Sequence, residues 1–155
     1  MEELFMRHIY VDPSRLDSGW HQQRLQGDFR RQWERLLHLS RFLDERERVL
    51  LEAVYEQEGR VSRLARLTRS SPANLRRRIQ DITHRLTRHE LHALLKYPDA
   101  FSGFEQACLR DHLVRKRPLE RVARDLGATV YEVRKTLTRV RAKTERLNET
   151  PPPRK

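Results

Sequence analysis

Arginine dominates one stretch of this sequence. Between residues 59 and 89 there are nine arginines and a single acidic residue, Asp81. A guanidinium group pairs with phosphate oxygens, and Arg, Asn and Gln can each form two hydrogen bonds with the edge of a base. The stretch holds all three types close together, in Asn74, Arg77 and Gln80. These residue types predict a surface that binds nucleic acid.

The elements that must position these side chains are two helices and a turn within 63–86. Ser71 suits the N-cap of the second helix, and Pro72 suits its first position. Small Ala65 allows the two helices to approach closely where they cross. Apolar residues recur along the second helix at the spacing of one buried stripe. They are Leu75, Ile79, Ile82 and Leu86. The pattern is typical of a helix-turn-helix, whose second helix enters a DNA major groove.

The same pattern recurs 58 residues further along the chain. The offset maps apolar residues onto apolar residues, small onto small, and a capping hydroxyl onto a capping hydroxyl. Examples are Leu64 and Val122, Ala65 and Ala123, Ser71 and Thr129, Leu75 and Val133, Ile79 and Leu137, and Ile82 and Val140. A whole register of positions at one offset indicates a tandem repeat.

The exposed faces of the two longer helices carry the predicted DNA contacts. They are Asn74, Arg76, Arg77, Arg78 and Gln80 in the first copy, and Tyr131, Arg134, Lys135, Thr138 and Arg139 in the second. Arg77 could pair with guanine, and Asn74 or Gln80 with adenine. The flanking basic residues, with Arg63 and Arg121, are better placed for phosphates. The alternative for each is an ordinary solvated side chain.

The composition predicts an all-α fold, since glycine is scarce and strand-like alternation is rare. We expect two tandem trihelical helix-turn-helix modules after a long N-terminal helix. The predicted segments are an arm and amphipathic helix (1–42), a first module (43–98), a second module (99–148) and a disordered basic tail (149–155). The first helix would run from Asp17 or Ser18 to about Phe42, with Trp20 and Trp33 in the core or, less favoured, on a partner surface. Capping boxes are predicted at Asp44–Glu47, Ser102–Glu105 and Thr129–Glu132.

Charge and motif content restrict the function. The net charge is +11, and residues 101–155 alone carry fourteen basic and seven acidic side chains. Such a balance indicates an acidic partner such as DNA. The sequence shows no phosphate-binding loop or nucleophile motif, and His84, His89 and His92 lack the companions of a metal site. We therefore expect no enzyme, no cofactor and no metal.

Location is also predicted from residue types. The single cysteine, Cys108, falls opposite Leu50 in the repeat and is expected to be a small core residue. One cysteine cannot form a disulfide within the chain, which suits a reducing compartment. With no signal peptide or spanning apolar run recognisable, we expect a cytoplasmic protein without membrane contact.

Several of these residues resemble a known family. Residues 43–51 (LDERERVLL), with Tyr55, Leu64-Ala65, Ser71-Pro72, Leu75 and Arg78, resemble region 4 of bacterial sigma-70-family RNA polymerase sigma factors. The second copy looks similar through Val122-Ala123, Leu126-Gly127, Thr129 and Val133. The resemblance covers about 43–86 and 101–144, and it implies promoter recognition and docking on RNA polymerase. The chain departs from the family in having Arg69 where the turn usually has Gly, and it has no counterpart of the DNA-melting region 2.

Two functions follow as hypotheses. The first is a bacterial DNA-binding transcription regulator or sigma-factor-like protein whose two modules bind sites about one helical turn apart. The second is an adaptor that docks on RNA polymerase or another transcription protein, with little specific DNA binding. RNA ranks lower because no aromatic stacking platform is present. The sequence leaves open the target sequence, the direction of regulation, the oligomeric state and which copy reads DNA.

Overall fold

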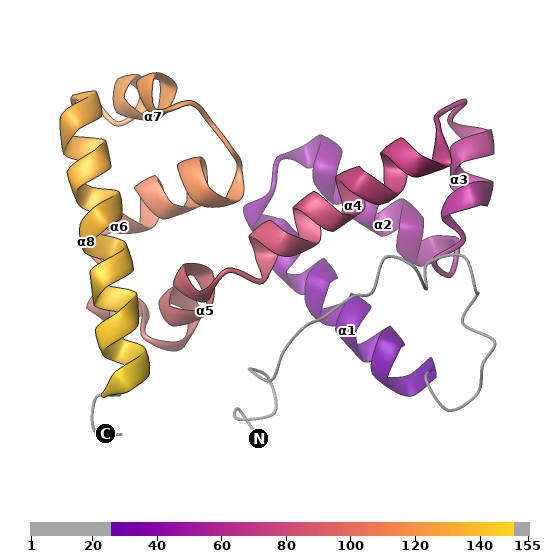
Figure 1. The fold of residues 1–155 in the computed structure, drawn as a ribbon, viewed down its shortest axis with the longest axis horizontal. Helices are drawn as coiled ribbons and strands as arrows, with labels where there is room; N and C mark the ends of the chain where they lie inside the picture. The colour runs from indigo at the N-terminus through magenta and orange to yellow at the C-terminus, as the bar shows by residue number, and fades with distance from the viewer. Residues whose placement is uncertain (1–25, 151–155) are drawn as a thin grey trace. The chain divides into compact units, whose positions relative to one another are not determined.

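The computed structural model describes residues 26–150, and this range contains helices and no strand. The all-α prediction is therefore confirmed for the described residues (Figure 1). The predicted arm, the helix start at Asp17 or Ser18, Trp20 and residues 151–155 of the tail lie outside them. In chain order the elements are α1 (Gln26–Leu39), the 3-10 turn η3 (Ser40–Phe42), α2 (Glu45–Glu56), α3 (Val61–Leu67), α4 (Pro72–Leu86), α5 (His89–Lys96), the 3-10 turn η4 (Pro98–Ala100), α6 (Gly103–Cys108), the π-helix η5 (Leu109–Val114), α7 (Leu119–Asp125) and α8 (Val130–Glu149).

The described chain forms two compact units that divide between Leu86 and Thr87. This differs from the predicted division between 98 and 99, because α5 packs within the second unit. Leu91 and Leu94 of α5 are buried, and the helix contacts α8. The apolar face of α5 thus assigns the segment to the unit that covers that face.

The core of the first unit lies among α1, α2 and α4. Trp33 and Leu36 of α1 are fully buried, and α1 contacts both α2 and α4. The preferred core assignment of Trp33 is confirmed. The stripe predicted on α4 is also buried, since each of its four residues is at most 3% exposed. Leu86, the last of them, is fully buried.

The start of α2 differs from the predicted capping box. Asp44 occupies the N-cap position in an extended conformation, but its side chain makes no capping hydrogen bond. The Glu47 carboxylate accepts hydrogen bonds from Arg85 of α4 instead, with an Nη1–Oε2 distance of 3.1 Å. The capping-box prediction is wrong here, because a residue distant in sequence binds the carboxylate that would have completed the box. After α2 ends at Glu56, both Glu58 and Gly59 have left-handed backbone, with φ of +52° and +73°.

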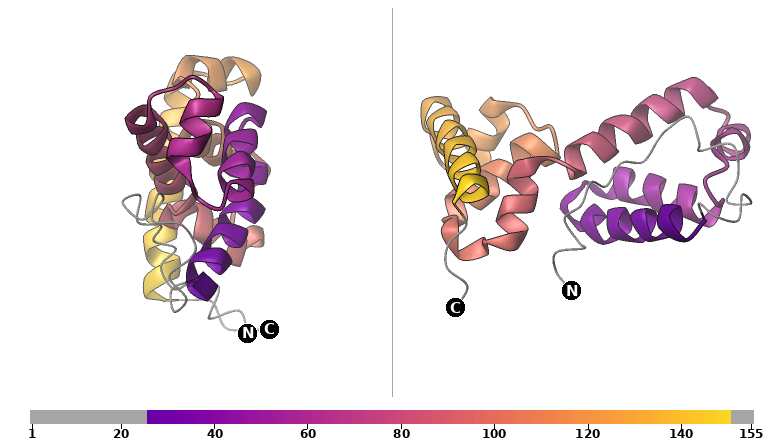
Figure 2. Two further views of the ribbon diagram at one scale, coloured as in Figure 1. Left: turned by 90° about the vertical axis from the view of Figure 1, so that its right-hand side faces the viewer. Right: turned by 60° about the horizontal axis from the view of Figure 1, so that its bottom comes forward.

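The second unit is built along α8, which contacts α5, α6 and α7 (Figures 1 and 2). Both predicted capping boxes of this unit are present. The Ser102 hydroxyl accepts from the Glu105 N–H at 3.2 Å, and the Thr129 hydroxyl accepts from the Glu132 N–H at 3.2 Å. The helix that begins with α6 continues as the π-helix η5 from Leu109.

No helix among residues 26–150 combines the length and the apolar character that crossing a bilayer requires.

Candidate nucleic-acid interface

Two helix pairs carry the predicted contact residues. α3 contacts α4 in the first unit, and α7 contacts α8 in the second. α7 begins 58 residues after α3, and α8 begins 58 residues after α4. The same offset relates the start of α6 to the start of α2. The sequence repeat is therefore matched by a repeat in the helix bounds.

The turns within the two pairs also correspond. Arg69 and Gly127 both have left-handed backbone, with φ of +52° and +64°. After each, an N–H bonds back to the buried alanine of the preceding helix: Ser70 to Ala65 and Ala128 to Ala123, both at 2.8 Å. The first turn thus takes the conformation of the second without a glycine. An L-residue with a Cβ carries a steric cost of about 1 kcal/mol in that conformation, whereas glycine does not.

Four of the five predicted residues of α4 are exposed: Asn74, Arg77, Arg78 and Gln80. Arg76 is half-buried, and its Nη2 donates to the Ser62 hydroxyl of α3 at 3.4 Å. Arg76 therefore lies at the junction of α3 and α4, beside the exposed face. The spacing of residues along one helix cannot predict a polar contact with a residue of another helix.

All five predicted residues of α8 are exposed: Tyr131, Arg134, Lys135, Thr138 and Arg139. Tyr131 is 70% exposed, which is unusual for an aromatic side chain, and Lys135 Nζ lies 6.0 Å from its ring centroid. Thr138 donates its hydroxyl hydrogen to the Arg134 carbonyl at 3.1 Å, so its methyl group and both oxygen lone pairs remain available on the helix surface.

The helices α3 and α7 add further basic residues. Arg66 and Arg124, which the predicted site lacks, are exposed at equivalent positions, as are the predicted phosphate contacts Arg63 and Arg121. Within residues 60–80 and the equivalent residues 118–138, four pairs of positions are basic in both units, and we call them the paired basic set. Its members are Arg63 and Arg121, Arg66 and Arg124, Arg76 and Arg134, and Arg77 and Lys135. The 58-residue offset alone would have identified Arg66 and Arg124.

The two helix pairs differ in charge. Residues 60–80 contain seven arginines and no acidic residue. The equivalent residues 118–138 contain four basic and three acidic residues. The three acids are Glu120, Asp125 and Glu132, and all three are exposed.

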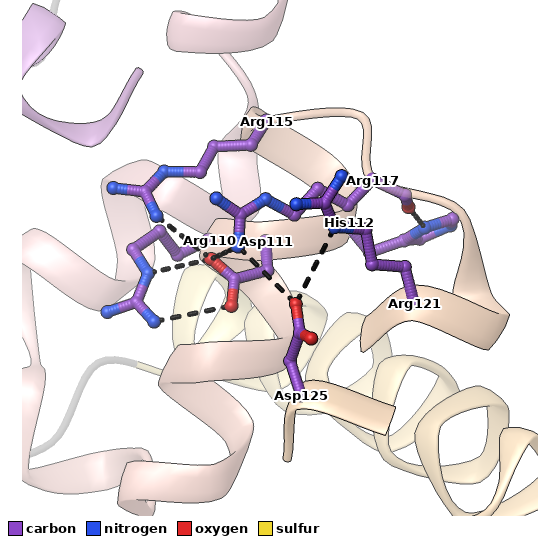
Figure 3. A network of polar contacts seen from close by, with 7 residues as sticks. All are labelled: Arg110, Asp111, His112, Arg115, Arg117, Arg121 and Asp125. Carbon is purple, nitrogen blue, oxygen red and sulfur yellow. Dashed lines mark hydrogen bonds and ion pairs between the residues drawn. The ribbon is translucent and has the colours of Figure 1, made fainter. Parts of the chain in front are cut away.

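A polar network surrounds the π-helix of the second unit (Figure 3). The Asp111 carboxylate is almost fully buried and accepts from Arg110 Nε at 3.0 Å and Arg115 Nη1 at 3.3 Å. Arg117 Nη1 lies 3.9 Å from the same oxygen. Burial by itself would raise the pKa of Asp111, but the Arg110 hydrogen bond and the three guanidinium charges hold that pKa below its usual value.

The network extends to Asp125, the last residue of α7. Arg117 and Arg121 both face Asp125, at 3.8 and 3.7 Å, and Figure 3 shows the two side chains converging on it. The His112 Nδ1 lies 2.8 Å from the Arg117 carbonyl oxygen, which fixes Nδ1 as the protonated ring nitrogen. The first unit has Ala53 and Leu67 at the positions of the two aspartates. The network is therefore a feature of the second unit.

An ion pair at equivalent positions occurs in both units. Arg85 binds Glu47 in the first, and Lys143 binds Glu105 in the second at 2.6 Å. Arg85 also donates to Asp81 at 3.1 Å, and Lys143 also donates to the Ala100 carbonyl at 2.8 Å. Burial alone would raise the pKa of Glu105, but hydrogen bonds from Lys143 and the Ser102 N–H lower it. Each pair ties the first helix of the three-helix segment to the far half of the last.

The described residues contain neither a reactive cysteine nor a metal site. Cys108 is fully buried, and burial, with Asp111 and Glu105 nearby, raises the pKa of its thiol to about 11. Within residues 26–150, no three His, Cys, Asp or Glu side chains come together as a metal site. What the exposed faces of α4 and α8 offer is hydrogen-bond donors and positive charge.

Comparison with known proteins finds no family model, no curated protein and no solved structure that matches this chain.

Proposed function

We propose that this chain binds duplex DNA through two helix-turn-helix modules, α2–α4 and α6–α8, and that it regulates transcription. The paired basic set carries the proposal. Basic residues stand at four equivalent positions of residues 60–80 and 118–138, and seven of the eight are exposed. Solvated surface residues have no reason to keep one sign of charge at equivalent positions, whereas a phosphate-binding surface does.

The geometry of α4 supports insertion into a major groove. The helix begins at Pro72, which has no N–H, and the N–H groups that follow it, with the positive end of the helix dipole, would attract a phosphate. Asn74, Arg77 and Gln80 lie on its exposed side. These types pair with adenine or guanine by two hydrogen bonds each. Arg63 and Arg66 on α3 would contact the flanking phosphates.

The second module offers a comparable but different face. Lys135 is the counterpart of Arg77 and could donate to guanine. Thr138 presents a methyl group, which can contact the methyl group of thymine. Arg134 and Arg139 are exposed and would contact phosphates. With two modules in one chain, the target would consist of two half-sites.

The role in transcription rests on the resemblance to region 4 of sigma-70-family sigma factors. That family reads promoter DNA and docks on RNA polymerase, so RNA polymerase is the protein partner that we propose. A cytoplasmic, bacterial setting follows from the same resemblance.

A second candidate function is an adaptor that docks on RNA polymerase or another transcription protein. Tyr131 favours it, because exposed aromatic and arginine side chains are typical of protein interfaces. The three acidic residues on α7 and α8 would weaken contact with phosphates there.

The test is duplex binding by the full chain with Arg77→Ala and Lys135→Ala together, measured by fluorescence anisotropy. We expect the double variant to lose about tenfold or more in affinity for a preferred duplex, since a good bidentate pair contributes about 1 to 3 kcal/mol. The matched control is Arg48→Ala with Arg146→Ala, which removes the same charge from exposed positions on α2 and late α8. Equal affinity of the double variant and wild type would show that these faces do not contact DNA.

A further inference from the structure

Resting on the proposed function, we infer that the two modules bind duplex DNA in a fixed order of strength. The α3–α4 face is the main phosphate-binding surface. Three carboxylates, Glu120, Asp125 and Glu132, keep the α7–α8 face from binding arbitrary duplex. The second module therefore engages DNA only when the first has brought it there.

The residues of the two faces correspond position by position, so the charges of the two faces can be compared directly. Helix bounds and turn hydrogen bonds repeat at one offset, and so does the paired basic set. The first face has no carboxylate within residues 60–80, and it adds Arg60, Arg69 and Arg78. The second has Pro118, Gly127 and Thr136 at those three positions. Residues 60–80 thus have a net charge of +7 and residues 118–138 a net charge of +1, although the helices and turns of the two faces correspond.

Asp125 acts directly on the basic groups of the second face. It lies 3.7 Å from Arg121, a member of the paired basic set, and 3.8 Å from Arg117. The equivalent residue of the first module is Leu67, so Arg63 has no carboxylate in that place. A phosphate that approaches Arg121 must compete with a carboxylate already in contact.

Glu132 places a fixed negative charge on the first turn of α8. Its carboxylate accepts from the Thr129 N–H at 2.7 Å and the Thr129 hydroxyl at 2.8 Å. These hydrogen bonds lower the pKa of Glu132, so it remains ionised at neutral pH. The equivalent residue of the first module is the neutral Asn74. A charge at this turn faces the groove that the helix would enter.

The energetic consequence is dependence of one module on the other. Affinity for arbitrary duplex comes from neutralised phosphates, and each contact contributes a slope of about −0.9 to the salt dependence. With Arg139 included, the second face has five basic and three acidic groups, so it gains less from this term than the first face. Because the second module is linked to a first module that is already bound, its effective concentration near DNA is high. The second module can then bind at sequences that match its own contacts.

The experiment compares matched arginine pairs in the full chain, using a random-sequence duplex titrated at several salt concentrations. Arg63→Gln with Arg66→Gln should reduce the slope of log affinity against log salt by about two, since two phosphate contacts are lost. Arg121→Gln with Arg124→Gln should change the slope by less than about half of that. Arg63→Lys with Arg66→Lys keeps the charge and should bind like wild type.

A second arm restores charge to the second face. Glu120→Gln with Asp125→Asn leaves the Glu132 cap intact and should steepen the slope by about one or two contacts. Glu52→Gln with Glu56→Gln makes the same change in net charge at exposed positions of α2. This control should leave the slope close to wild type, and circular dichroism checks that each variant is folded.

The outcomes separate the inference from the proposed function. Unequal effects of the arginine pairs, with a steeper slope for the Glu120 and Asp125 variant, would support the order of strength. Equal effects of the two pairs, or no steepening beyond the α2 control, would overturn it while leaving DNA binding intact. The second of these results would favour a protein partner for α7–α8. Absence of salt-dependent binding by the wild-type chain would overturn the proposed function and the inference with it.

Discussion

At the residue scale, the turn between α3 and α4 carries an avoidable strain. Arg69 has φ of +52°, whereas the equivalent turn of the second module has Gly127 at +64°. The backbone hydrogen bonds that follow the two residues have the same length, so the conformation is imposed by the turn. The side chain at this position serves another purpose, which in our account is positive charge beside α4.

Arg69→Gly should therefore stabilise the chain by about 1 kcal/mol, because glycine has no Cβ to clash in left-handed backbone. Gly127→Ala should destabilise it by about the same amount. No atom lies within 4 Å of a Cβ built at Gly127, so the whole effect would come from backbone conformation. Thermal unfolding of the two variants measures both changes in stability. Stabilisation by Gly127→Ala would contradict the claim that a side chain at this left-handed position is strained.

At the element scale, the network around Asp111 joins the π-helix to α7. Asp111→Asn would leave three guanidinium groups facing a neutral amide. We expect a loss of about 2 kcal/mol, below the roughly 3 to 5 kcal/mol of a fully buried pair, because the arginines are partly exposed to water. Urea unfolding followed by circular dichroism measures the change, and an unaltered free energy of unfolding would show that the network contributes nothing net.

Acid should weaken the same elements. The pKa values of Asp111 and Glu105 are lower in the folded chain than their ordinary values of 3.8 and 4.5. Both groups therefore stabilise the fold fully above those ordinary values, and that contribution is lost as the pH falls through them toward the folded values. Unfolding free energies measured between about pH 7 and pH 3 should fall, and less steeply in Asp111→Asn. Equal slopes would exclude Asp111 as a source of the pH dependence.

Helices and caps were predictable where the signal is local. The apolar stripe of α4 and the boxes at Ser102 and Thr129 follow from residues a few positions apart, and the structure agrees. The box at Asp44 fails because Glu47 binds Arg85, 38 residues away. The division after Leu86 was missed for the same reason, since only the packing of α5 on α8 decides where α5 belongs.

The candidate site shows the same limit. Helical periodicity correctly placed nine of its ten residues on exposed surface. It could not show that Arg76 turns toward Ser62, nor that Asp125 holds Arg121. Those contacts depend on which helices meet, and a stripe on one helix does not contain that information.

At the scale of the whole molecule, two three-helix segments share one helix order but differ in two respects. The shared positions are those that bury apolar side chains, cap helices or present basic groups. The exposed faces of α3–α4 and α7–α8 differ in charge, and the described part of the first unit has no counterpart of the π-helix η5 and its Asp111 network. Such a chain can combine a strong, salt-dependent contact with a weaker contact that depends on the first.

The central claim is that the chain reads duplex DNA. The most direct measurement is selection of bound sequences from a pool of random duplexes, using the purified full chain at a low and a high salt concentration. We predict binding that weakens with salt and an enriched motif with two parts, one for each module. Binding without any enriched sequence at either salt concentration would contradict this account and leave only nonspecific attraction between a basic protein and DNA.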